Sequence, residues 1–203
     1  MPKRKLITYL NKKYPISEGL KILLENEGTL DLTSSKKGTS LLIPRMNVHE
    51  VHYLISGMCK AFWLNEDNEE EIFQIWTADS LILLLEVFFA GHKNTTVHIV
   101  MLEDSELITI TKVQLDEMEM VYPEMKKVME RIRAEILELR NLQLRILMKK
   151  EGERYALFYD MFPELRARLT NKDIGAFLGI CQSTLGNCKK SRLLKDRSKK
   201  KSR

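Results

Sequence analysis

The sequence predicts an α+β protein in which a β-roll is followed by a long helix and an all-helical C-terminal region. Three observations predict this order: short apolar or alternating runs recur up to residue 111, a helical period begins at Lys112, and a helix-turn-helix spacing lies within residues 170–190. The predicted domains are an N-terminal helix and β-roll (1–111), a long helix (112–150), a helix-turn-helix domain (151–192) and a basic tail (193–203).

The N-terminal region changes from a helical to a β pattern. Leucines at helical spacing predict a helix that ends near Gly28, and a stretch rich in Ser, Thr, Lys and Gly (33–40) predicts a loop. Beyond it, turn signals such as Ser56-Gly57 separate short apolar runs, which is typical of a β-sandwich or roll. The predicted strands are residues 41–43, 51–55, 59–64, 72–76, 97–101 and 107–111.

The predicted long helix carries a coiled-coil pattern. Apolar residues alternate in spacings of four and three, with one polar member, Gln143, that can fix the register of two paired helices. We therefore expect a homodimer through this seam, and the alternative is a single amphipathic helix that packs on its own domain. The seam consists of Met125, Met129, Ile132, Ile136, Leu139, Gln143 and Ile146.

The helix-turn-helix is predicted from the spacing of small, capping and apolar residues. Thr170 with Asp173 resembles a capping pair that opens a helix. Gly175 is small where a second helix must cross closely, Gly179 suits the turn, and Ile180 fills the joint. A plain helical hairpin is the alternative.

The second helix of this motif presents polar residues outward and is followed by concentrated positive charge. Leu185 and Cys188 form its inner face, and residues 189–203 hold nine Lys or Arg against one Asp. Such a charge fits a nucleic-acid backbone, although a solvated tail is the alternative. We expect double-stranded DNA as the partner. The predicted base-reading residues are Gln182, Ser183 and Asn187, the predicted phosphate contacts are Thr184, Lys189, Lys190 and Arg192, and Thr170 is a further candidate contact.

Three segments together resemble the CRP/FNR family of bacterial regulators: residues 53–57 (Tyr-Leu-Ile-Ser-Gly), 104–107 (Asp-Ser-Glu-Leu) and 169–186. Residues 161–165 look like the shorter, Bacteroidetes-type members. The resemblance implies a roll like the cyclic-nucleotide-binding jelly roll, a homodimer that binds an inverted repeat, contact with RNA polymerase, and no enzyme activity.

The resemblance also places an effector pocket at Glu86, Thr95 and Thr96. Nucleotide-binding members hold the phosphate with a Gly-Glu pair and a later arginine, but here Leu85 precedes Glu86 and threonines stand where the arginine is expected. A threonine hydroxyl cannot replace a bidentate arginine, so we expect no cyclic AMP binding, an unknown effector and no cofactor. The family's best-known recognition helices carry arginines where this chain has Gln182 and Asn187.

Composition disfavours other classes of protein. Three scattered cysteines suit a reducing cytoplasm and form no metal clamp, and the apolar stretch 81–90 is too short to cross a membrane. A cupin-like metal site would use His49 and His52, but this spacing on a strand predicts opposite faces. A roll that binds a ligand or partner without touching DNA is the other alternative.

Overall fold

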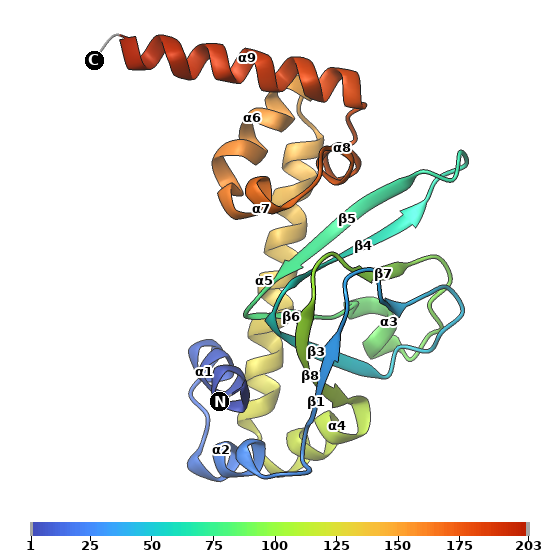
Figure 1. Cartoon of the computed structure of the whole chain (residues 1–203). Coiled ribbons are helices and arrows are strands. Elements are labelled where there is room, and N and C mark those ends of the chain that lie inside the picture. The colour runs from blue at the N-terminus through green and yellow to red at the C-terminus, as the bar shows by residue number, and fades with distance from the viewer. Residues whose placement is uncertain (1, 202–203) are drawn as a thin grey trace. The chain divides into compact units, whose positions relative to one another are not determined.

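The computed structural model describes residues 2–201, with side chains described as far as Leu194 (Figure 1). The chain forms two compact units. The first contains the residues up to Trp63 together with Gln74–Ile136, and the second contains Leu64–Phe73 together with the residues from Leu137 onward.

Two four-stranded sheets form the β-roll that the sequence predicted (Figure 1). One has the order β1-β8-β3-β6 and the other β2-β7-β4-β5. The strands are β1 (Asp31–Ser35), β2 (Ser40–Leu42), β3 (Glu50–Ser56), β4 (Met58–Leu64), β5 (Glu70–Thr77), β6 (Ser80–Ile82), β7 (His98–Met101) and β8 (Ser105–Thr111), with helix α3 (Leu85–Ala90) between β6 and β7.

Helices cover the outer face of the first sheet and form the main core with it. Alternation along β3 turns Val51, Tyr53 and Ile55 toward these helices, whereas His52 and Leu54 face the interior of the roll. Leu6 of α1 and Leu24 of α2 are completely buried in this core. The covering helices are α1 (Pro2–Lys13), α2 (Glu18–Glu25), α4 (Lys112–Val121) and the first half of α5 (Glu124–Leu147).

The predicted loop at 33–40 was partly wrong, because β1 occupies its first residues. β1 pairs antiparallel with β8, from Asp31 opposite Thr109 to Ser35 opposite Ser105. It is an edge strand with mostly exposed side chains, so its backbone hydrogen bonds stabilise it without an apolar alternation. The short strand β6 was also missed, since it lies within a continuous apolar run.

The predicted long helix over 112–150 is two helices. A capping box formed by Thr111 and Gln114 opens α4, which ends at Val121 with Tyr122 as its C-cap. Pro123 disfavours helical geometry in the residue before it and lacks a backbone N–H, so the chain starts again as α5. The N-terminal helical region is likewise divided, because Ser17 caps a separate α2.

Most of the predicted dimer seam packs inside its own unit. Met125, Met129 and Ile132 belong to the core beneath the sheet, and Ile136 packs against it. Ile146 is buried as well, whereas Leu139 is half exposed. Buried side chains cannot meet a second copy, so the amphipathic alternative holds for the first half of this seam.

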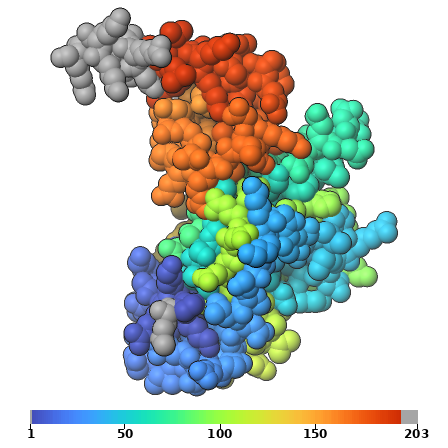
Figure 2. Space-filling view, in the orientation of Figure 1, coloured from blue at the N-terminus to red at the C-terminus, as the bar shows by residue number. Residues whose placement is uncertain are grey.

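The second unit contains the second half of α5 and, in the described residues, four further helices: α6 (Glu151–Met161), α7 (Pro163–Arg168), α8 (Asn171–Leu178) and α9 (Gln182–Lys201). α6 lies against α9, as Figures 1 and 2 both show. The predicted basic tail is instead a continuation of α9 as far as Lys201, because neither Gly nor Pro follows Gly186. The structure does not describe residues 202–203. No helix in residues 2–201 has the length and apolar character needed to span a membrane.

Candidate functional site

Helices α8 and α9 form the helix-turn-helix that the sequence predicted. The Thr170 hydroxyl oxygen accepts a hydrogen bond from the Asp173 backbone N–H at 3.1 Å and thereby caps α8. A Cβ at position 175 would lie 2.8 Å from the Ile180 carbonyl oxygen, so only glycine allows this close crossing. Gly179 ends α8 with a φ of 60°, in the left-handed region.

Buried contacts fix the inner side of this motif. Ile180 and Leu185 are 5% and 1% exposed, which confirms their predicted inward positions. Arg154 of α6 donates hydrogen bonds to the carbonyl oxygens of Leu178 and Gly179, at 3.1 and 3.2 Å. These bonds satisfy carbonyls that the end of α8 leaves without helical partners, and they attach the turn to α6.

The start of α9 presents a polar surface to solvent. Gln182, Ser183 and Asn187 are exposed, as is Lys190 further along. Each of these side chains can donate a hydrogen bond, and because each is exposed to solvent, a binding partner can reach it. Thr184 is half buried and borders a cavity between α6 and α9. The predicted base-reading residues therefore share one exposed helix end.

Two of the predicted phosphate contacts have other partners. The Lys189 ammonium donates a hydrogen bond to Asn171 at the start of α8. Arg192 forms an ion pair with Asp160 and lies over the Tyr159 ring, 4.8 Å from its centre. Arg192 therefore holds α9 against α6, and its predicted role as a phosphate contact does not fit this inward position.

Cys181, immediately before α9, is the cysteine that we expect to react fastest with alkylating reagents. Its sulfur lies 3.1 Å from the Ser183 hydroxyl and 3.2 Å from that of Thr184. These hydrogen bonds lower the pKa of the exposed thiol to about 7, whereas burial raises the pKa of Cys59 and of Cys188. Thiolate, the reactive form, should be about one tenth of Cys181 at pH 6 and about nine tenths at pH 8.

Mass spectrometry of iodoacetamide-treated protein checks this order. Alkylation of Cys181 should accelerate as the pH rises through 7, and the Cys181→Ser variant should lose the fast phase. Equal rates at Cys181 and Cys188 would contradict the assignment.

The three predicted effector residues lie on the exposed surface of the roll and border neither of the two cavities described in the first unit. Glu86 lies on the exposed side of α3, and Thr95 and Thr96 are exposed in the bend before β7. A cavity between strands of both sheets, which we call the roll cavity, has none of these residues in its wall. The effector pocket that the resemblance implies at these residues stays a prediction.

Buried Asn94 holds the loop before β7 in place through several hydrogen bonds. Its amide donates to the carbonyls of Ile43 and Val97 at 2.9 and 2.7 Å, and its side-chain oxygen accepts from the Val97 N–H at 2.9 Å. Its backbone also exchanges hydrogen bonds with Arg45 and Met46. Because Val97's N–H already has a partner, it is not free to hold an anion. The loop instead fixes the residues around 43–46.

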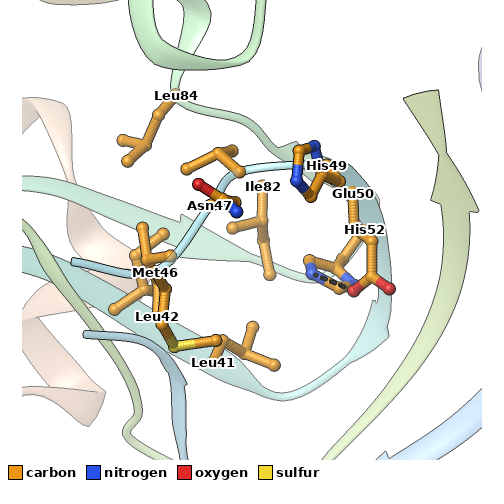
Figure 3. Close-up of a pocket in the computed structure, with 11 residues that line it drawn as sticks. Leu41, Leu42, Met46, Asn47, His49, Glu50, His52, Ile82 and Leu84 are labelled. Carbon is orange, nitrogen blue, oxygen red and sulfur yellow. Dashed lines mark ion pairs between the residues drawn. The ribbon is translucent and has the colours of Figure 1, made fainter. Parts of the chain in front are cut away.

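Sequence reasoning placed His49 and His52 on opposite faces, and this was wrong. His49 precedes β3 instead of lying in it, so both histidines border the roll cavity (Figure 3). Even so, no group of three His, Cys, Asp or Glu suited to a metal ion occurs in the part of the chain that the structure describes. The inward alternation of β3, with Leu54 beside His52, was the signal that could have revealed this position.

Comparisons identify the architecture. No protein-family model matches the sequence, and neither does any curated protein. Among solved structures, FixK2 from Bradyrhizobium japonicum is 15% identical with a TM-score of 0.71, over 82% of this chain and 86% of that one. A transcriptional regulator of the crp/fnr family from Eubacterium rectale is 15% identical with a TM-score of 0.70, over 93% and 88%.

A third solved structure extends the likeness to another bacterium. The c-di-GMP responsive global regulator CLP from Xanthomonas campestris is 14% identical with a TM-score of 0.65, over 83% of this chain and 88% of that one. At identities of 14–15%, the fold is what this chain shares with these three structures. The chain thus has the fold of the CRP/FNR-type transcription regulators.

Proposed function

We propose that this protein is a transcription regulator that binds an inverted-repeat DNA operator as a homodimer and responds to a small molecule other than cyclic AMP. The observation that carries the proposal is the exposed polar start of α9, held on a closely crossed helix-turn-helix. In such motifs the second helix enters the major groove with its N-terminal residues toward the bases. Gln182 and Asn187 suit adenine edges, and Ser183 suits either base type.

The proposed dimer uses a face of α5 that the sequence-derived seam did not include. A second set of residues has the same spacing of three and four on the opposite side of the helix, and we call it the α5 stripe. It consists of Ala134, Leu137, Asn141 and Leu144 of α5 together with Met148, which directly follows the last residue of α5. All five are exposed, and Leu137, Leu144 and Met148 are 51%, 57% and 85% exposed. A second copy of the same stripe would cover these apolar side chains and pair Asn141 with its equivalent.

The DNA contacts are tested by two kinds of substitution, one expected to change sequence preference and the other to change affinity and its salt dependence. Gln182→Ala or Asn187→Ala should relax sequence preference, by roughly 1–3 kcal/mol per lost base contact. Lys190→Ala should weaken binding to all sequences alike and flatten the logarithmic salt dependence by about 0.9. Selection from a random DNA library, followed by titrations at several salt concentrations, measures both effects.

Lys12→Ala is the matched control, because Lys12 is also an exposed lysine but lies on α1. It should leave both the affinity and its salt dependence unchanged. Absence of sequence enrichment with the unaltered protein, in extracts containing its native small molecules, would reject DNA binding. A roll that binds ligand or partner alone would then be the function.

A further inference from the structure

The roll cavity has a defined wall and a preformed shape. It encloses about 180 Å³ between strands of both sheets, and its inner wall includes Leu42, Ile82 and Ile99, each no more than 6% exposed. The loop at its mouth is held by Asn94 and by the pairing of Asn47 with Lys93. A dry cavity of roughly 150 Å³ accommodates a benzene ring, so this one fits a single six-membered ring with a small substituent.

Apart from Asn47, the polar side chains that line this cavity lie together at one side (Figure 3). His49 and Glu50 stand at its exposed edge, and His52 lies deeper. Nε2 of His52 is 3.7 Å from a carboxylate oxygen of Glu50, which is too far for a direct hydrogen bond. Nδ1 of His52 already has a partner, the Thr109 hydroxyl at 2.9 Å.

The protonation of this pair defines what it can recognise. Burial lowers the pKa of His52, and the Glu50 carboxylate opposes this shift only in part, so the imidazole is neutral at pH 7. The tautomer with hydrogen on Nε2 avoids placing two acceptors face to face, with the Thr109 hydroxyl donating to Nδ1. The pair then offers one donor, from His52, and one acceptor, from Glu50.

We infer that the roll cavity binds a small, uncharged, mostly apolar molecule through one hydroxyl group placed between His52 and Glu50. A hydroxyl can accept from the imidazole N–H and donate to the carboxylate at once, which fits the gap between them. An anion is disfavoured, because the wall contains Glu50 but neither Lys nor Arg among its residues. Control of DNA binding by such a molecule rests on the proposed function. Binding of the molecule to the roll cavity does not depend on that proposal.

Cyclohexanol is a suitable probe, and cyclohexanecarboxylate is its anionic counterpart with the same ring. Titration of the full-length protein, followed by methyl NMR signals of Ile82 and Ile99, should show cyclohexanol binding in the millimolar range or tighter and no comparable shift with the carboxylate. Glu50→Ala should weaken cyclohexanol binding by about tenfold or more, because it removes a hydrogen bond to a charged acceptor.

Two further variants make the result interpretable. Glu106→Ala removes an exposed strand carboxylate that does not border the cavity and should leave binding unchanged. Leu41→Phe, at a half-buried wall position, should fill the space and abolish binding. Equal binding of alcohol and carboxylate, or an unaltered affinity in Glu50→Ala, would overturn the hydroxyl assignment, and absence of any shift would overturn the site. DNA is not present in these titrations, so their failure is distinct from failure of the regulator proposal.

Discussion

Replacing Leu137 and Leu144 together with aspartate should convert the proposed dimer into a monomer in solution. In a symmetric dimer the double substitution removes four leucines from the interface and places four carboxylates there. Losing buried leucines costs about 2–5 kcal/mol each, and unpaired buried charges add to this, so the dissociation constant should rise by at least about a thousandfold. Light scattering over a concentration series measures the change.

Leu139→Asp is the matched control for this experiment. Leu139 is 50% exposed, as much as Leu137, but it lies about 200° further around α5. The Leu139→Asp variant should remain dimeric if the α5 stripe is the interface. A monomer produced by Leu139→Asp, with Leu137→Asp and Leu144→Asp still dimeric, would instead restore the seam first predicted from the sequence.

Replacing Gly57 with alanine should destabilise the β-roll more than a glycine-to-alanine substitution at any other described glycine of the roll. Gly57 has a φ of 101°, a conformation that residues with a Cβ rarely adopt. The added carbon would lie 2.0 Å from the Ser105 hydroxyl oxygen and 2.9 Å from the Asp104 carbonyl oxygen. Strain and overlap together should cost roughly 3–5 kcal/mol of unfolding free energy.

Gly38→Ala separates the two contributions. Gly38 also has a positive φ, 85°, but a Cβ there would meet nothing within 4 Å, so only the backbone strain of about 1 kcal/mol should remain. Urea unfolding followed by tryptophan fluorescence reports on the roll alone, since the two tryptophans, Trp63 and Trp76, lie in β4 and β5. Equal losses in the two variants would show that the overlap at Gly57 is relieved by movement of Ser105.

The order of the roll and the helices could be predicted from the sequence because the spacing of apolar residues differs between the strands and the helices. Strand boundaries were predictable where apolar residues alternate, as in β3, and not in the polar edge strand β1, which pairing with β8 defines. The break at Pro123 was available to sequence reasoning, but the heptad pattern that follows it concealed where α5 begins.

The candidate site was predictable in its backbone and less so in its side-chain contacts. Spacing alone identified Gly175 and Gly179, because few arrangements need small residues at both positions. Arg192 was assigned to DNA on charge, but its ion pair with Asp160 depends on how α6 packs against α9. A heptad pattern likewise shows that a face is buried without showing whether its own chain or a second copy buries it.

For the proposed DNA-binding dimer, the α5 stripe determines how operator occupancy depends on the amount of protein. Only two leucines and one methionine are apolar and large among its five residues, and Asn141 interrupts them. Such an interface favours a monomer–dimer equilibrium, in which doubling a mostly monomeric pool raises the dimer about fourfold by mass action. DNA that holds two recognition helices would in turn draw monomers into pairs. The regulator would then respond to its own synthesis more steeply than a permanent dimer does.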